Sequence, residues 1–372
     1  MTNIPIITLK SGKERTLTNF HPWIFSGAIS KLPKDLVLGG EVIVADHSGK
    51  AHARGHYCGS EGLVLRLFCF DMSAEINESF WRNKLEQAWS LRAMLALPSH
   101  ETNGFRFLHG EGDGFSGLVC DIFGDSAVIQ LSNPGLEPIL PLIEKFLAER
   151  GISNTDSVCI SSFRENNLIF NADLISGQKT GHFLDQRDNR KLLSQLVKHK
   201  RVLDAFCYSG GFSVYALKGG AQAVTSVDIS EQAISLCKNH VEHNRPFVGE
   251  HHTIVADCFN YLRDIKAGDF DVIVLDPPAF AKSSHAVERA ARGYKDINLL
   301  ALKNLAPGGL LFSFSCSQHV SVDLFRKIIF AAAKDAGRNA KVIYELNQAP
   351  DHPVSLFCPQ SGYLKGLVCQ VD

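Results

Sequence analysis

Residues 201–228, RVLDAFCYSGGFSVYALKGGAQAVTSVD, decide the fold class of this chain. The stretch predicts a buried strand over 201–206, a glycine-bearing turn, a helix over about 212–218 and a second strand that ends at Asp228. An apolar run that breaks at glycines and restarts as a helix is typical of βαβ units that bind nucleotide-type cofactors. We therefore expect a cofactor site at this turn.

The residues around the turn indicate which cofactor fits. Gly210 and Gly211 let the backbone approach a ligand closely, but their spacing is not the G-x-G-x-x-G that holds a pyrophosphate. Asp204 would repel a diphosphate and suits a cation, and Asp228 is placed to accept hydrogen bonds from a ribose. An adenosine with a positively charged amino-acid tail, S-adenosylmethionine, fits this pattern. An ordinary turn of another doubly wound enzyme is the alternative.

Length and composition limit the class of protein. A chain of 372 residues suggests two or three domains, and 45% hydrophobic with 21% charged residues is ordinary for a soluble globular protein. The net charge of the chain is −1, so a polyanion such as RNA would have to bind at a local basic patch. The ten cysteines show no zinc spacing, so we expect no metal. Because no signal peptide or membrane-length apolar run is seen, we expect a cytoplasmic protein and no membrane partner.

Residues 1–72 predict a small β domain, because short β-rich runs alternate with glycine and Asp-His-Ser-Gly turns. The segment 19–27, NFHPWIFSG, carries aromatic residues near basic ones. Aromatic side chains beside cations suit base stacking in RNA, which makes Arg15, His21 and Trp23 candidate RNA contacts. It is equally open that the aromatic residues belong to the core and that the cations form a solvated face.

Residues 73–178 predict a central β-β-α-β-β domain, with a long helix over about 76–97 ahead of it. Its second helix is expected over about 136–150 and its last two strands over about 157–163 and 167–171. Glu111 and Asp113, in the sequence Gly-Glu-Gly-Asp-Gly, resemble a metal or acid–base pair. Turn residues between glycines are the simpler interpretation.

Residues 179–372 alternate strands with helices, among them a strand over 271–275 and a helix over 294–305, which predicts an α/β fold with a mostly parallel sheet covered on both faces. A helix that ends near residue 197 leads into the strand at 201. The last two strands, over 341–346 and 364–371, follow each other without a helix between them. They predict an antiparallel hairpin at one edge of the sheet.

In such a sheet, ligands bind at the carboxyl ends of the parallel strands. Aspartates stand at four of these expected strand ends, at residues 204, 228, 257 and 276. Asp257 by itself also reads as a helix cap. At this edge we expect it to bind the adenine amino group, with Cys258 and Phe259 packed on the ring.

Two segments at the same edge carry the catalytic candidates. In 276–280, DPPAF, the prolines stiffen the loop and present a fixed carboxylate to a planar substrate. Asp276 suits a ring nitrogen that gains a proton during reaction. Cys316 lies between two serines in the sequence FSFSCS, after a buried strand, where a nucleophile is favoured over a structural cysteine.

Taken together, residues 201–228, LDPPAF, GYKDINLLAL and FSFSCS resemble the class I methyltransferases of the RlmI type, the bacterial 23S rRNA cytosine carbon-5 methyltransferases. The resemblance covers nearly the whole chain. HPWIFSG resembles that family's N-terminal PUA domain, a small RNA-binding β barrel, and HGEGDGFSGLVCDIFGD its central domain. GHFLDQRDNR resembles the segment that borders the cofactor, and QAPDHP also fits. Ala279 stands where some RNA cytosine methyltransferases have a second cysteine, so Cys316 is the single candidate nucleophile.

The resemblance implies binding residues position by position. Besides the aspartates at 204, 228, 257 and 276 and Cys258, the implied cofactor contacts are Phe183, Asp185, Arg187, Phe206, Tyr208, Ser209, Gly210 and Ile229. Besides the three N-terminal residues, the implied substrate contacts are Pro277, Pro278, Phe280, Tyr294 and Lys295.

The implied chemistry follows from the weak nucleophilicity of cytosine carbon 5. A thiolate that adds to carbon 6 makes carbon 5 able to attack the sulfonium methyl group. We expect Cys316 to add, Asp276 to protonate nitrogen 3, and a base that the sequence does not identify to remove the carbon-5 proton. The thiol needs a nearby cation or donor that the sequence does not locate. The target base must be unstacked, so single-stranded or loop RNA is expected.

Three alternatives remain open from sequence. A methyltransferase of the same fold acting on a guanine nitrogen or another base would leave Cys316 structural. A non-catalytic RNA-binding factor of ribosome assembly would need only the N-terminal domain. A nicotinamide dehydrogenase is disfavoured because the phosphate-binding glycine triplet is absent. The sequence does not predict the modified nucleotide, whether 23S rRNA is met free or in an assembling subunit, or the oligomeric state, for which a homodimer is kept as one option.

Overall fold

The computed structural model describes residues 4–59, 61–154, 160–174, 182–281 and 283–372. The chain divides into two compact units: Met1–Phe163, Asp173–Ser176 and Pro350–Ser361 form the first, and Arg164–Ala172, Gly177–Ala349 and Gly362–Asp372 the second. Residues 157–159 of an expected strand and the expected start of the third domain, at residues 179–181, lie outside the described residues. The division into three domains stays a prediction. No helix among the described residues is long and apolar enough to span a membrane.

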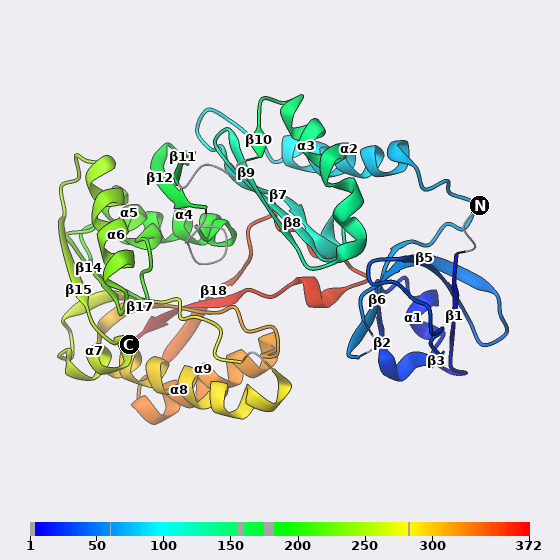
Figure 1. The fold of residues 1–372 in the computed structure, drawn as a ribbon. Helices are drawn as coiled ribbons and strands as arrows, with labels where there is room; N and C mark the ends of the chain where they lie inside the picture. The colour runs from blue at the N-terminus through cyan, green and yellow to red at the C-terminus, as the bar shows by residue number, and fades with distance from the viewer. Residues whose placement is uncertain (1–3, 60, 155–159, 175–181, 282) are drawn as a thin grey trace. The chain divides into compact units, whose positions relative to one another are not determined.

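The first unit begins with a six-stranded sheet, as the alternating β-rich runs predict (Figure 1). Its order is β2-β6-β5-β4-β1-β3, and β1 runs parallel to β4 while its other pairings are antiparallel. A short helix, α1 (Arg15–Thr18), follows the first strand. The strands are β1 (Ile6–Leu9), β2 (Trp23–Phe25), β3 (Ile29–Lys31), β4 (Glu41–Ala45), β5 (Ala51–Tyr57) and β6 (Leu63–Cys69). Alternate residues such as Val42, Val44 and Leu65 are buried, so one face of the sheet forms its core.

The rest of the first unit is a four-stranded sheet, ordered β10-β9-β8-β7, that packs with two helices. Asn77 caps α2 by accepting a hydrogen bond from the backbone N–H of Phe80. The elements are α2 (Glu78–Met94), β7 (Gly104–His109), β8 (Leu118–Phe123), β9 (Ser126–Leu131), α3 (Leu140–Ala148) and β10 (Ser153–Asn154). The expected helix over 136–150 starts instead as a 3₁₀ segment, η3 (Pro134–Ile139). The hairpin of β11 (Ile160–Glu165) and β12 (Leu168–Asp173) then contains the boundary between the units.

The second unit contains the alternating α/β fold that the sequence predicts. Its seven-stranded sheet has the order β15-β14-β13-β16-β17-β19-β18. The strands are β13 (Arg201–Ala205), β14 (Ala223–Asp228), β15 (Glu250–Val255), β16 (Phe270–Leu275), β17 (Leu305–Ser315), β18 (Ala340–Asn347) and β19 (Lys365–Val371). The first five are parallel, and β19 pairs antiparallel with both β17 and β18. The antiparallel edge hairpin is therefore confirmed, and its second strand lies inside the sheet while β18 forms the edge.

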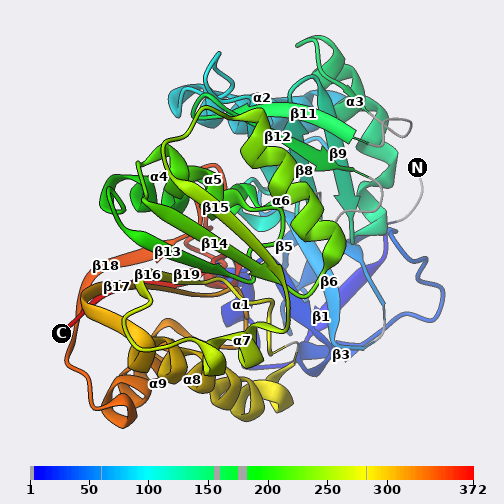
Figure 2. The ribbon, with the colours of Figure 1, turned by 90° about the vertical axis from the view of Figure 1, so that its left-hand side faces the viewer.

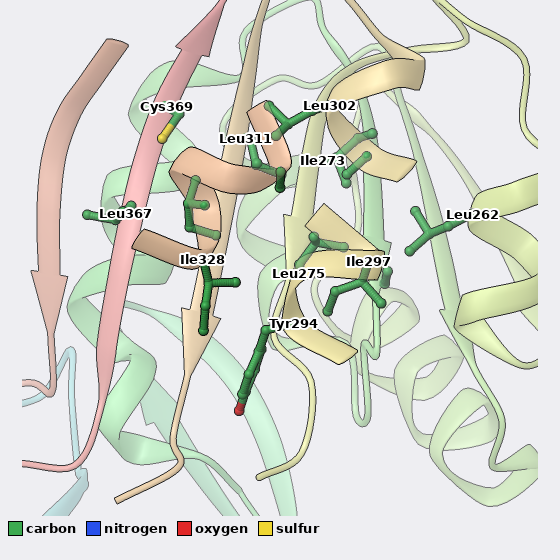
Figure 3. Close-up of a cluster of buried hydrophobic side chains, with 14 of the residues drawn as sticks. Leu262, Ile273, Leu275, Tyr294, Ile297, Leu302, Leu311, Ile328, Leu367 and Cys369 are labelled. Atoms are coloured by element: carbon green, nitrogen blue, oxygen red, sulfur yellow. The ribbon is translucent and has the colours of Figure 1, made fainter. Parts of the chain in front are cut away.

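Helices cover both faces of this sheet (Figures 1 and 2). On one face lie α4 (Arg187–Leu196), α5 (Gly211–Lys218) and α6 (Glu231–His243), and on the other α7 (Cys258–Asp264), α8 (Val287–Asn304) and α9 (Val322–Ala336). The second face holds the largest described core, in which Leu275, Ile297 and Leu311 are fully buried (Figure 3).

Helix α8 begins at Val287, well before the expected start at residue 294. Gly293, a poor helix former, lies inside it and hides the helical pattern. A Cβ at Gly293 would lie 3.3 Å from the Cδ2 atom of Phe280. The glycine therefore makes room for the Phe280 ring, and the weak helix position has a packing role.

Candidate active site

The parallel strands of the second unit end at one edge of the sheet, as expected. The turn after β13 contains Phe206, Tyr208 and Gly210 with backbone φ angles of 62°, 47° and 77°. Left-handed backbone is costly for large aromatic residues and is kept mainly where function requires the turn. A Cβ at residue 210 would lie 2.3 Å from the Sγ atom of Cys237, so only glycine fits there.

Asp228 fixes this turn from the end of the neighbouring strand. Its Oδ2 atom accepts a hydrogen bond from the backbone N–H of Tyr208 at 2.9 Å, and its Oδ1 atom accepts one from the N–H of Ser230 at 2.9 Å. Ile229, the next residue, is 70% exposed although it is apolar. A rigid carboxylate beside an exposed aliphatic side chain suits a ribose and the adenine attached to it.

Asp204 lies beneath the turn rather than on its surface. Its Oδ2 atom accepts a hydrogen bond from the Ser213 hydroxyl at 2.6 Å, whereas Oδ1 is buried without a hydrogen-bond partner. Burial raises the pKa of Asp204 to about 8. A buried acceptor without a donor is costly, and the ammonium group of an amino-acid tail would satisfy it.

The acid that follows β15 is placed at the start of a helix. Asp257 caps α7, because its Oδ1 atom accepts a hydrogen bond from the N–H of Asn260 at 2.9 Å. The side chain of Cys258 is buried, and its sulfur accepts a hydrogen bond from the N–H of Phe206 at 3.2 Å. Burial raises the pKa of Cys258 to about 12, so this thiol stays neutral and supports the turn from below.

A row of aromatic rings connects the turn to the catalytic candidates. The ring centroids of Phe206 and Phe259 lie 6.1 Å apart, those of Phe259 and Phe280 5.9 Å, and those of Phe280 and Tyr294 4.6 Å. The first three rings are half-buried. Tyr294 is fully buried and its hydroxyl lies 2.9 Å from the Ser317 Oγ atom. An effect of Tyr294 on a substrate would therefore pass through Phe280 or the loop that contains Ser317.

Cys316 and the Asp-Pro-Pro segment lie together, as expected from the strand ends. Cys316 is half-buried, and its sulfur lies 4.0 Å from the carbonyl oxygen of Pro277. Asp276 directly follows β16 and is half-buried, Pro277 is buried and Pro278 is exposed. Burial is the main cause of the raised pKa of Asp204, and interactions with Cys237 and then Asp276 raise it further, so the catalytic candidate and the cofactor turn share one electrostatic environment.

The segment that leads into β13 packs against the turn. The Phe183 ring meets the Tyr208 ring edge-on at 5.3 Å between centroids. Asp185 is buried and accepts a hydrogen bond from the Tyr363 hydroxyl at 2.5 Å, and the side chain of Arg187 is buried too. Ser209 is buried within the turn itself.

A buried ion pair that no sequence motif predicts holds this segment. Arg190 donates to both carboxylate oxygens of Glu165 at 2.7 Å and to the carbonyl of Phe183 at 2.9 Å. Burial opposes ionisation of Glu165, but the Arg190 guanidinium lowers the pKa of that carboxyl to about 2. Arg190 lies in the quoted GHFLDQRDNR motif, whereas its partner lies in the hairpin 25 residues earlier.

The N-terminal candidates belong to the first unit. Arg15 is exposed, and the Nε2 atom of His21 lies 3.2 Å from the side-chain oxygen of Gln360. The indole N–H of Trp23 donates to Glu111 at 2.8 Å, so the polar atom of this ring is already used within the unit.

The other charged candidates have ion-pair partners. Glu111 pairs with Arg66, and Asp113 with Arg92, which agrees with structural roles for both turn acids. Lys295 pairs with Asp335 across α8 and α9 at 2.5 Å. Within the described ranges, no cluster of three or more histidine, cysteine or acidic residues is arranged to hold a metal.

Two family models match the chain. Residues 153–365 match an S-adenosylmethionine-dependent methyltransferase, and residues 7–70 match a PUA-like domain. The fold and the site therefore define a class I methyltransferase with S-adenosylmethionine as its cofactor, as the turn at 206–211 predicts.

Proteins named ribosomal RNA large subunit methyltransferase I are similar over the full length. Those of Klebsiella pneumoniae and Pseudoalteromonas atlantica are each 37% identical, with 99% and 98% of this chain and 98% and 99% of those proteins covered. The chain belongs to this methyltransferase family. Two solved structures, SMU.776 complexed with SAH and a SAM-dependent methyltransferase from Streptococcus mutans, share the fold with a TM-score of 0.85 at 22% identity. They cover 99% of this chain and 100% of their own.

The raised pKa of Asp204 gives a testable property of cofactor binding. A carboxyl with a pKa of about 8 is mostly protonated at pH 7. A bound ammonium would favour the carboxylate and lower that pKa, so S-adenosylhomocysteine, which carries the same ammonium, should release about one proton on binding at pH 7. Calorimetry in buffers of different ionisation enthalpy measures this number. Asp204→Asn should release none, and a wild-type protein that binds without proton release would contradict the assignment.

Proposed function

We propose that this protein transfers a methyl group from S-adenosylmethionine to carbon 5 of a cytosine in the RNA of the large ribosomal subunit. The observation that carries the proposal is the position of Cys316, beside Pro277 and at the sheet edge that holds the cofactor turn. A half-buried thiol at this place has access to a ligand that a core cysteine lacks. The names of the full-length relatives support the RNA of the large subunit, 23S in bacteria, as the substrate class.

The cofactor would lie along the ends of β13, β14 and β15. Asp204 would face its ammonium group, Asp228 its ribose, and Asp257 its adenine amino group, with Ile229 and Phe206 against the adenine ring. Tyr208, Ser209 and Gly210 would form the turn around its tail. Phe183, Asp185 and Arg187 would close the site from the leading segment, with Asp276 at the substrate side. When bound, the cofactor supplies an electrophilic methyl group.

The residues of this chain would carry out the remaining steps on the base. Pro277, Pro278 and Phe280 would hold the cytosine flat, with Lys295 near its phosphate backbone. The Cys316 thiolate would add to carbon 6, and Asp276 would protonate nitrogen 3, so that carbon 5 becomes nucleophilic. After transfer, a base removes the carbon-5 proton, and the electron pair of that bond re-forms the double bond between carbons 5 and 6 and expels the thiolate. Nitrogen 3 returns its proton to Asp276, which restores both the neutral base and the acid.

RNA binding would also involve the first unit. Arg15, His21 and the ring face of Trp23 would contact RNA, and the match of a PUA-like domain to residues 7–70 supports this role. We infer a cytoplasmic location because the proposed substrate is ribosomal RNA.

The rival proposal, methylation of a guanine nitrogen or another base, needs no covalent adduct. RNA containing 5-fluorocytidine separates the two, because fluorine at carbon 5 blocks the proton loss that releases the enzyme. Wild-type protein with S-adenosylmethionine should form a complex with this RNA that survives denaturing electrophoresis. Cys316→Ala should form none. Turnover of the fluorinated RNA without any adduct would contradict carbon-5 chemistry.

A further inference from the structure

A buried lysine lies beneath the loop that carries Cys316. Lys365, the first residue of β19, is only 7% exposed. Its ammonium donates to the carbonyl oxygens of Ser317 at 2.6 Å and Val320 at 2.7 Å. Among the described residues it forms no ion pair with a carboxylate. A buried cation that is held only by neutral carbonyl groups is costly, and an anion beside it would offset part of that cost.

The strand register places this lysine opposite Ser315, the residue before Cys316. Lys365 is the antiparallel partner of Ser315 across β17 and β19. Lys365 is therefore adjacent to the residues on both sides of the cysteine: its backbone pairs with Ser315, and its ammonium hydrogen-bonds to the carbonyl of Ser317. Ser317 is also held by the segment that follows the Asp-Pro-Pro residues, since its Oγ atom accepts a hydrogen bond from the N–H of Ala281 at 3.1 Å, and it contacts the Tyr294 hydroxyl of α8. The loop after β17 is thus clamped between β19 and the Asp-Pro-Pro side.

The charges around Cys316 agree with this placement. Burial lowers the pKa of Lys365 to about 8, and its interaction with Cys316 acts in the opposite direction by favouring the ammonium. Tyr294, from α8, also interacts with Cys316, but burial raises its pKa and keeps the hydroxyl neutral. Asp276 adjoins Pro277 and would disfavour a second anion, and His319 of the same loop is exposed. Of the groups named here, Lys365 is the cation whose charge favours a thiolate at residue 316.

We propose that Lys365 is a positioning residue of the methyl transfer, whose buried ammonium stabilises the thiolate of Cys316 and fixes the loop from Cys316 to Val320. The role rests on the proposed function, in which Cys316 must ionise before it adds to the base. Lys365 acts through Cys316 and does not touch the substrate. It supplies the local cation that a catalytic thiol requires.

Alkylation of Cys316 in the full chain tests the charge directly. The rate of iodoacetamide labelling of the Cys316 peptide, measured by mass spectrometry from pH 5 to 10, reports the ionised fraction of this thiol. In Lys365→Met the pH of half-maximal labelling should rise by about one unit or more. Lys365→Gln keeps hydrogen-bond donors without the charge and should show the same rise. Lys341→Met, at an exposed lysine on the neighbouring β18, should label as the wild type does.

A purely structural clamp gives a different pattern. With a purely structural clamp, the pH of half-maximal Cys316 labelling would stay at the wild-type value in Lys365→Met, or it would rise there and return to the wild-type value in Lys365→Gln. Either result would overturn the proposal. Because labelling needs neither RNA nor turnover, it is independent of which base is methylated. Failure of the proposed function would appear instead as full methylation by Cys316→Ala.

A reciprocal measurement does not depend on the folding of Lys365 variants. Nuclear magnetic resonance of ¹³C-lysine-labelled protein follows the titration of Lys365, in the wild type and in Cys316→Ala. Mutual stabilisation requires the midpoint of the Lys365 titration to fall when the thiolate is removed. An identical midpoint in the two proteins would show that the groups do not interact, and would contradict the proposal.

Discussion

Replacing Cys316 with alanine is expected to lower methyl transfer to RNA by at least about 10³-fold while the protein still binds S-adenosylhomocysteine. The expectation follows from the chemistry of cytosine, because carbon 5 attacks a methyl group only after a nucleophile has added at carbon 6. The structure puts the Cys316 sulfur 4.0 Å from the Pro277 carbonyl and gives it a half-buried position. Transfer of tritiated methyl groups to RNA measures the rate, and calorimetry measures the retained binding.

Cys58→Ala is the matched control, since Cys58 is the other half-buried cysteine of the described chain and lies in the first unit. It should methylate at the wild-type rate. A Cys316→Ala protein that keeps more than about a tenth of wild-type activity would exclude the thiol as nucleophile. It would favour the rival reaction at a guanine nitrogen, in which this cysteine is structural.

Asp276→Asn is expected to lower kcat by about 10²- to 10⁴-fold, the range typical for loss of a general acid. Asparagine keeps the shape of the side chain and can hydrogen-bond the base, but it cannot give a proton to nitrogen 3. The two prolines that follow should hold the amide in the position of the carboxyl. The single-turnover rate should fall, and its pH profile should lose the decline towards high pH that reports ionisation of the acid.

The control for this variant is Asp296→Asn, at a half-buried acid on α8 that pairs with Arg263. It should behave as the wild type does. Asp276→Asn within about threefold of wild-type kcat would mean that the carboxyl does not transfer a proton. If kcat were kept while cofactor binding was lost, Asp276 would act on the cofactor side alone.

The elements of the second unit could be predicted closely because their signals are local. The strands β13, β14 and β16 are short apolar runs that break at glycine, aspartate or proline. The bounds of β13 and β16 lie within one residue of those expected, and β14 ends at Asp228 as expected. The start of α8 was missed because Gly293 interrupts its pattern. The insertion of β19 between β17 and β18 has no local signal either, since it depends on pairing between strands that are far apart in sequence.

The candidate site divides in the same way. Residues at strand ends, such as Asp228 and Cys316, could be placed at one edge from the topology alone. The direction of a side chain could not: Tyr294 is fully buried, and the Cys258 side chain supports the turn from below. Partners separated by many residues were also out of reach, as with the Glu165–Arg190 pair and with Lys365. Their positions depend on which strand or hairpin comes to lie beside the site.

The most direct test of the account is a map of 5-methylcytosine in the ribosomal RNA of cells with and without this protein. Bisulfite sequencing of 23S rRNA should show a cytosine that loses its methyl group when the protein is removed. The wild-type protein should restore the methyl group, and Cys316→Ala should not. An unchanged cytosine map, with a methylated guanine or another base lost instead, would contradict carbon-5 chemistry at Cys316.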